Sequence, residues 1–206
     1  MDKDTERRSF TLEDLTLESR AESDDAPPRI VGHAAVFNSL SEEIFGFREK
    51  IAPGAFAKTL GGDVRALFNH DPNYVLGRTK AGTLRIAEDA TGLAVDIDPP
   101  NTVMGRTVVE AVRRGDVSEM SFGFRTIKES WDHSGEEIVR TLEEVELFDV
   151  SPVTFAAYQQ TDVAVRAFEA WQAAEGGKPV DEVDGPEAHP RRDIMRLRTD
   201  QARATT

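Results

Sequence analysis

Two short segments of alternating apolar and polar residues constrain the fold most strongly. Residues 82–87 and 92–97 each follow a period of two, and residues 88–91 between them suit a turn. Two such segments joined by a short turn are typical of an antiparallel hairpin. The sequence therefore predicts that this part of the chain builds a β-rich sheet.

The same reasoning predicts further strands on both sides of the hairpin. They are an edge strand within residues 10–17, a core strand at 29–37, strands at 64–68 and 120–124, and one or two strands within 138–153. The strand at 64–68 is expected to stop at Asp71-Pro72.

Helices are predicted at three places. Residues 53–60 have Pro53 in the first turn and glycine at the end, and residues 103–114 are capped by Asn101 or Thr102 and stopped by Gly115. A helical stretch covers 163–174. The predicted fold class is β-rich α+β, as a closed or nearly closed β-barrel with short helices packed outside it.

The length of 206 residues suits one domain with tails. Residues 1–28 are interpreted as an N-terminal segment with an acidic linker that contributes an edge strand, and residues 29–167 as the main domain. Residues 168–206 are expected to form a tail that starts as a helix. After residue 176 this tail lacks apolar periodicity, so we expect it to be disordered or ordered by a partner.

Composition excludes several classes of function. A net charge of −13 argues against nucleic-acid binding and favours neutral or basic protein partners. The absence of cysteine excludes disulfides, thiolate catalysis and cysteine-ligated zinc, and is compatible with a reducing cytoplasm. The first residues are charged, and no apolar run reaches the roughly 18 residues that span a bilayer, so we expect neither a standard export signal nor a membrane segment.

A candidate nucleophile lies in the motif DVSEMSFGF, residues 116–124. Alternation in a strand would place Ser121 and Gly123 on the face opposite Met120 and Phe122, and Gly123 would leave room beside the hydroxyl. The plain alternative is a small polar residue on a solvated face. Ser118 is a second candidate, but its place after a helix is typical of a capping or turn residue.

A serine hydroxyl needs a base, and His70 is the best-placed of the four histidines. It follows the strand at 64–68, at the kind of strand end where catalytic side chains are presented. Strict alternation would put it on the face of Val64 and Phe68, so either the strand breaks before His70 or that face lines a cleft. His33 suits a core strand, His133 a turn, and His189 the tail.

The strand around residues 142–150 offers three acids to orient the histidine. Glu144 and Glu146 share one face, whereas Asp149 falls with Val145 and Leu147, and the pattern alone supports no choice. A metal site made of His33, His70 and Asp71 is a weaker alternative, because the sequence contains no metal-binding motif. It also contains no phosphate-binding motif. We therefore expect neither metal nor cofactor.

Seven short motifs occur in order along about two thirds of the chain. They are GHAAVFN at 32–38, IAPGAF at 51–56, VRALFNHD at 64–71, LGRT at 76–79, GLAV at 92–95, RGDVSEMSFGF at 114–124 and EVELFDVSPVTF at 144–155. Together they resemble the prohead proteases, the capsid-maturation serine proteases of tailed bacteriophages. The family often continues Pro-Ala-Asn after the last phenylalanine, whereas this chain has Ala156 and Ala157 followed by Tyr158.

The resemblance implies that residues 29–167 are a prohead protease domain, similar in fold to the β-barrel of the herpesvirus assemblins. It implies Ser121 as the nucleophile and His70 as the base. The assemblins carry a second histidine in a His-Val-x-Leu strand, and Glu144 begins the equivalent EVEL of this chain, so Glu144 is the preferred third member, ahead of Asp149 and Glu146.

The implied activity is that of a serine endopeptidase that cleaves a scaffold protein, or the scaffolding segment of the major capsid protein, and its own termini. The implied partners are those capsid and scaffold proteins and further copies of the chain, as a homodimer or higher oligomer. The implied place is the host cytoplasm, inside assembling procapsids. The alternative is a catalytically silent scaffold or assembly protein that uses the same fold for binding.

Overall fold

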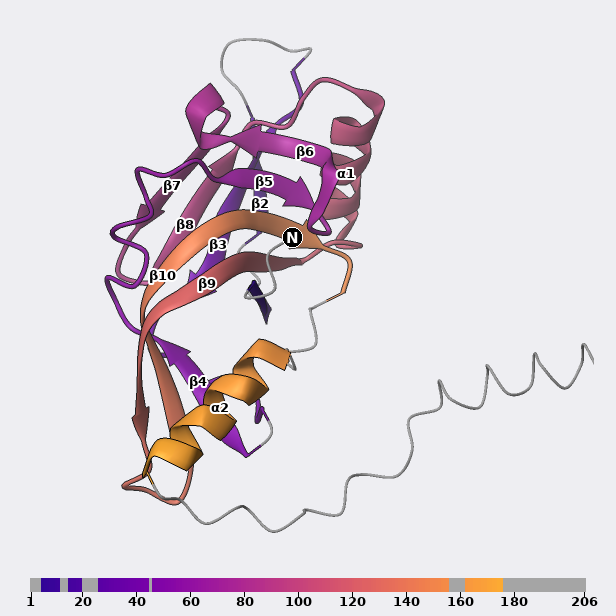
Figure 1. Ribbon diagram of the computed structural model, residues 1–206. Helices are drawn as coiled ribbons and strands as arrows, with labels where there is room; N and C mark the ends of the chain where they lie inside the picture. The colour runs from indigo at the N-terminus through magenta and orange to yellow at the C-terminus, as the bar shows by residue number, and fades with distance from the viewer. Residues whose placement is uncertain (1–4, 12–14, 20–25, 45, 156–161, 176–206) are drawn as a thin grey trace, which may run out of the picture.

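The computed structural model describes residues 5–11, 15–19, 26–44, 46–155 and 162–175. Within them the chain forms two β-sheets, two α-helices and one short 3-10 helix, η1 (Thr79–Ala81) (Figure 1). The first sheet has six strands in the order β1-β9-β10-β5-β6, with β4 also paired to β10. The second has four strands in the order β2-β3-β8-β7.

The elements of the first sheet are β1 (Glu6–Thr11), β4 (Phe47–Ile51), β5 (Arg65–Phe68), β6 (Asp71–Arg78), β9 (Glu119–Asp132) and β10 (Ile138–Val153). The antiparallel β9 and β10 form its long centre. On the other side of β10, β4 and β5 pair with it in parallel at different levels. The region 138–153 is thus one long strand.

The second sheet consists of β2 (Thr16–Glu18), β3 (Arg29–Val36), β7 (Leu84–Glu88) and β8 (Gly92–Ile97). The antiparallel pairing of β7 with β8 confirms the predicted hairpin. Asp89 closes its turn, because its carboxylate accepts the backbone N–H groups of Thr91 at 2.7 Å and Gly92 at 3.0 Å.

The main hydrophobic core combines side chains from both sheets. Phe122 and Phe124 of β9 stack at 4.8 Å between ring centroids, and Phe56 packs edge-on against Phe122. From the second sheet, buried aliphatic residues such as Ile30 and Leu93 join the same cluster. The alternation of β9 therefore places its aromatic residues inward, as the sequence predicted.

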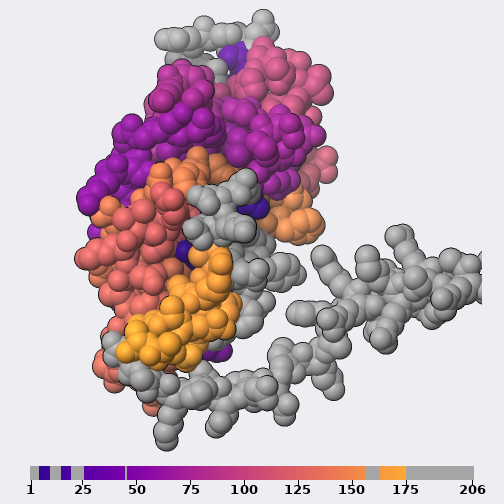
Figure 2. All heavy atoms as spheres, viewed as in Figure 1, coloured from indigo at the N-terminus to yellow at the C-terminus, as the bar shows by residue number. Residues whose placement is uncertain are grey.

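Two helices complete the described part of the chain. Helix α1 (Val103–Arg114) begins at Thr102, whose side chain accepts the N–H of Gly105, and ends at Gly115 in the left-handed conformation (φ 76°). Both ends agree with the sequence analysis. Helix α2 (Asp162–Glu175) packs Phe168 against Phe47 and Trp131 and lies beside the lower part of the β9–β10 ribbon (Figures 1 and 2). Neither helix is long and apolar enough to cross a membrane.

The β-rich α+β class is confirmed, but the pairings among the described residues close neither sheet on itself, so the barrel is not confirmed. The predicted helix at residues 53–60 is wrong: the segment is a series of tight turns, because Gly54 has φ 89°, which a right-handed helix does not accommodate. Strand β6 begins at Asp71, where the sequence analysis expected a strand to stop.

The segment boundaries at residues 28 and 167 remain predictions. Most of the tail after residue 167, including His189, lies outside the described residues, as does the middle of the acidic linker.

Candidate active site

His70 lies in the two-residue turn that joins β5 to β6. Phe68 pairs with Asp71, and the two residues between them, Asn69 and His70, have φ values of 54° and 57°. Positive φ at both central positions is what the tightest hairpin turns require, although glycine or asparagine usually supplies it. A histidine held this way costs about 1–3 kcal/mol of backbone strain, which is a common property of functional sites. The strand thus breaks before His70, one of the two alternatives left by the sequence.

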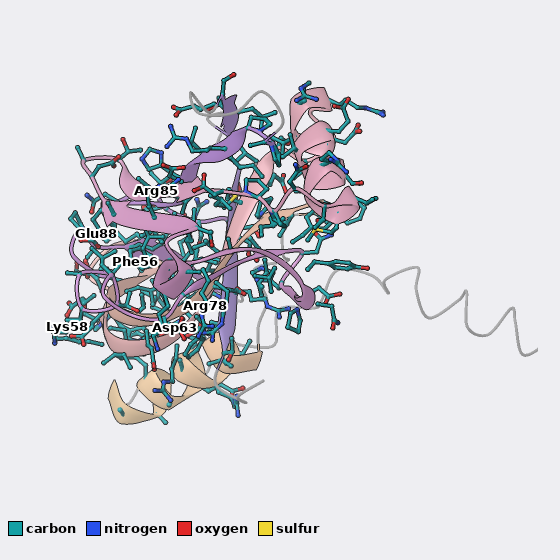
Figure 3. The ribbon with its side chains drawn as sticks, turned by 90° about the horizontal axis from the view of Figure 1, so that it is seen from above. Phe56, Lys58, Asp63, Arg78, Arg85 and Glu88 are labelled. Atoms are coloured by element: carbon teal, nitrogen blue, oxygen red, sulfur yellow. The ribbon has the colours of Figure 1, made fainter. Side chains whose placement is uncertain are left out.

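Asn69 fixes this turn to the end of β10. Its side-chain amide donates to the Thr154 hydroxyl at 3.1 Å and accepts the Thr154 N–H at 2.8 Å, while its own N–H donates to the Pro152 carbonyl at 3.1 Å. At the other end of the hairpin, Arg78 holds Asp63 through two hydrogen bonds of 2.7 and 2.6 Å (Figure 3). Hydrogen bonding to Arg78 lowers the pKa of Asp63 well below its usual range. Both ends of the hairpin are therefore anchored.

Ser121 lies on β9 and is fully buried, with 0 % of its surface exposed. Its hydroxyl oxygen is 2.7 Å from Nε2 of His70 and 2.8 Å from the carbonyl oxygen of Arg8 on β1. Because β10 lies between β5 and β9, His70 reaches over β10 to meet the serine. The solvated face that was the plain alternative for Ser121 is therefore covered.

Asp149 of β10 contacts the other side of the imidazole ring. Both of its carboxylate oxygens lie within hydrogen-bond distance of His70 Nδ1, at 2.9 and 2.8 Å, and its side chain is buried. The hydroxyl of Ser151 lies 3.3 Å from the same nitrogen. A carboxylate can only accept here, so Nδ1 carries a proton and Nε2 is left to accept from the serine.

A β-bulge brings Asp149 to this face of the sheet. Leu147 pairs with Phe124, but the next pair is Asp149 with Gly123, so Phe148 is an extra residue in β10. The extra residue shifts the alternation, and Asp149 moves from the core-facing side of Leu147 to the side of Ser121. Strict alternation from the sequence missed this change of face.

Gly123 makes room for the carboxylate. A Cβ atom at this position would lie 2.7 Å from one oxygen of Asp149 and 3.1 Å from the other, closer than atoms pack. The room that Gly123 was predicted to leave beside the Ser121 hydroxyl is therefore occupied by the acid.

The other candidates lie elsewhere. Glu144 pairs at 2.7 Å with Lys58, which lies at the edge of the molecule (Figure 3), and Glu146 pairs with Arg125. Ser118 is exposed in the loop before β9. The geometry thus brings Asp149, rather than the preferred Glu144, to His70.

The remaining described histidines do not meet His70. His33 lies on β3 with its Nε2 2.8 Å from Asp89, where hydrogen bonding from Gly92 and from His33 lowers the pKa of Asp89 to about 2. His133 packs against Trp171. Within the described residues no group of three or more histidine and acidic side chains is arranged to hold a metal ion.

Serine, imidazole and carboxylate therefore form one continuous hydrogen-bonded chain in a buried part of the molecule. Such a chain can draw the hydroxyl proton onto Nε2 while the carboxylate stabilises the resulting imidazolium. Comparison with known proteins agrees with this chemistry, because a sequence model of the caudovirus prohead serine proteases matches residues 14–175. The chain belongs to this family.

The resemblance noted in the sequence is thereby confirmed, and membership makes the chain a phage capsid-maturation serine protease. Among solved structures, this prohead protease is similar to the capsid assembly protease gp21 of bacteriophage T4. The two share 11% sequence identity with a TM-score of 0.49, over 73% of this chain and 98% of that chain. No curated protein sequence matches the chain.

Proposed function

We propose that this prohead protease is a serine endopeptidase in which Ser121 is the nucleophile, His70 the general base and Asp149 the orienting carboxylate. The observation that carries the proposal is the hydrogen-bonded chain itself, with 2.7 Å between Ser121 Oγ and His70 Nε2 and 2.8 Å between His70 Nδ1 and Asp149. Asp149 replaces Glu144 in this proposal, because Glu144 is paired with Lys58 instead.

In the proposed mechanism, Ser121 Oγ bonds to the carbonyl carbon of a scissile peptide while its proton passes to His70 Nε2. The tetrahedral intermediate collapses when Nε2 returns that proton to the departing amine, which leaves an ester on Ser121. Water then attacks the ester with His70 again acting as the base, and the carboxylic acid product leaves. Asp149 stays ionised throughout, and we assign the oxyanion to backbone N–H groups.

The proposed substrates follow from the family. They are a scaffold protein or the scaffolding segment of the major capsid protein, together with the protease's own termini, cleaved inside assembling proheads. The residues after 167 are the proposed self-cleaved or targeting extension, and assembly into a homodimer or higher oligomer belongs to the same proposal. Cleavage of a co-expressed capsid protein, followed by mass spectrometry, would identify these sites.

The decisive experiment replaces Ser121 with alanine in the full chain, co-expressed with its capsid protein. We expect cleavage to fall by roughly four to six orders of magnitude, as in other triad deletions. Ser118→Ala is the matched control and should cleave normally, since that side chain is exposed before β9. Unchanged cleavage in the Ser121 variant would remove it as the nucleophile. If cleavage also persists when Ser118 and Ser121 are both replaced, it does not depend on either serine, and the silent assembly protein is favoured.

A further inference from the structure

Strand β1 covers the edge of β9 that carries the nucleophile. It pairs antiparallel with β9, and the register sets Ser9 opposite Ser121 and Arg8 opposite Phe122. The carbonyl oxygen of Arg8 accepts a hydrogen bond of 2.8 Å from the Ser121 hydroxyl. β1 also precedes residues 14–175, the part of the chain that matches the family.

This contact competes with the proposed chemistry for the hydroxyl proton. The Ser121 hydroxyl has one proton, and both the Arg8 carbonyl and His70 Nε2 are close enough to receive it. When the carbonyl receives it, the proton is directed away from Nε2, and His70 does not take it up in that orientation. Ser121 is also fully buried beside β1, so a substrate reaches the hydroxyl only when the backbone of β1 leaves it.

Glu6 and Arg8 of β1 form a buried cluster of ion pairs with Glu49 and Arg140, and the places that their side chains occupy are called the ionic pocket below. Arg8 donates to Glu49 of β4 at 2.7 and 3.0 Å, and Arg140 of β10 donates to Glu6 at 2.9 Å. All four of these charged side chains are buried. Glu6 also accepts a hydrogen bond of 2.6 Å from the Thr126 hydroxyl.

The charges divide into two groups that each keep their own ion pairs, and the second group also includes the partly exposed Glu129 of β9, to which Arg140 donates at 2.7 Å. Within β1, Arg8 donates to Glu6 at 2.7 Å, and within the rest of the protein Arg140 donates to Glu49 at 2.8 Å. Removal of β1 therefore leaves no unpaired buried charge behind, which is the costly outcome when one partner of a buried pair is lost.

We propose that the β9 edge under β1 is the peptide-binding cleft of the protease, and that β1 occupies it as an internal ligand. The cleft takes an extended segment that pairs with β9 as an added strand, with a glutamate and, two residues later, an arginine in the pocket of Glu49 and Arg140. Backbone pairing supplies affinity and the pocket supplies selection, as in other strand-addition sites. The inference rests on the proposed function, because it takes Ser121 as the reacting group.

The first test locks β1 in place in the full chain. Thr11 and Glu119 lie directly opposite in the register, and such pairs have Cβ atoms about 5 Å apart, near disulfide range. The chain contains no cysteine, so the variant Thr11→Cys with Glu119→Cys has a single possible disulfide. Labelling of Ser121 by a biotinylated peptidyl phosphonate should fall about tenfold or more on oxidation and return on reduction.

The second test loosens β1. Arg8→Ala removes the hydrogen bonds from β1 to Glu49 and should raise the labelling rate about tenfold. Arg106→Ala makes the same charge change at an exposed position of α1, away from β1, and should not. An excess of the free peptide TERRSFT, residues 5–11, should reverse the increase. The peptide TRRESFT, with glutamate and arginine exchanged, should have no effect.

The outcomes separate the two proposals. If Ser121 is labelled at the same rate in the oxidised and reduced forms, the cleft inference is overturned and the proposed nucleophile stays intact. If Ser121 stays unlabelled in both forms, the proposed function fails. Binding of labelled TERRSFT would then test the peptide site by itself. Tighter binding to the reduced form than to the oxidised form would support the site, and equal binding would overturn it.

Discussion

The assignment of Asp149 is tested most directly by Asp149→Asn. Asparagine has nearly the same shape as aspartate, so the bulge and the packing around it should persist. What changes is the charge next to His70 Nδ1, which both oxygens of Asp149 approach at 2.9 and 2.8 Å. The amide can also donate to Nδ1, which moves the ring proton to Nε2 and removes the acceptor for the Ser121 hydroxyl.

The size of the effect follows from the geometry. The imidazolium and the carboxylate have charge centres about 4 Å apart, which corresponds to about 4 kcal/mol at an effective dielectric constant near 20. That energy is about three powers of ten in rate, and the wrong tautomer adds to it. We expect kcat to fall about a thousand- to ten-thousandfold, the range seen when the acid of such a triad becomes an amide.

The assay is the rate of capsid-protein cleavage by purified variants that share the wild-type melting temperature. The matched control is Glu144→Gln, which removes the same charge from the same strand. It should keep activity within about twofold, since the ion pair with the largely exposed Lys58 contributes little. A large loss in the Glu144 variant with near-normal activity in the Asp149 variant would refute the assignment and restore the choice made from the sequence.

Three further outcomes follow from the same structure. Gly123→Ala places a methyl group 2.7 Å from the Asp149 carboxylate and should lower kcat about a hundredfold and stability by about 1–3 kcal/mol, measured by cleavage rate and thermal melting. Unchanged kcat would contradict the geometry. Asn69→Ala loses both contacts to Thr154 at a positive φ and should destabilise by about 1–3 kcal/mol in urea unfolding, with Asn69→Gly less affected; equal losses would argue against backbone strain. Burial opposes ionisation of Glu6, but its arginine partners lower its pKa to about 2, so its stabilisation is complete above pH 4.5 and is lost as the pH falls toward 2. The cost of Glu6→Gln should therefore shrink from about 3 kcal/mol at pH 7 to near zero at pH 2, and a constant cost would contradict the ionised pair.

The regular elements could be predicted from the sequence because local rules govern them. The β7–β8 hairpin follows from alternation and a turn, and α1 begins at Thr102 and ends at Gly115, as capping rules require. Ser121 and His70 could also be singled out, because a strand face and a strand end are local features. The tight turns at residues 53–60 were mistaken for a helix because composition alone does not reveal the positive φ of Gly54.

The acid could not be chosen from the sequence because its position depends on a long-range irregularity. An extra residue at Phe148 becomes visible only when β10 is paired with β9, and it reverses the face on which Asp149 lies. Without the extra residue, strict alternation along β10 places Asp149 on the same face as the core residues Val145 and Leu147. The only local sign was Gly123, whose missing side chain marks close approach by another group, although the sequence does not say which.

Three departures from regular structure meet around one imidazole ring. The left-handed turn at Asn69 and His70 strains the backbone, the bulge at Phe148 interrupts the ladder, and Gly123 forgoes a side chain in a strand. Selection for stability alone would not be expected to keep three destabilising features in one place, because a substitution could remove each of them separately. Each of them instead serves the same contact: the turn presents the ring, the bulge turns the acid toward it, and the glycine leaves the acid its space. Their convergence on His70 is therefore a stronger argument for catalysis there than any one of the hydrogen bonds taken alone.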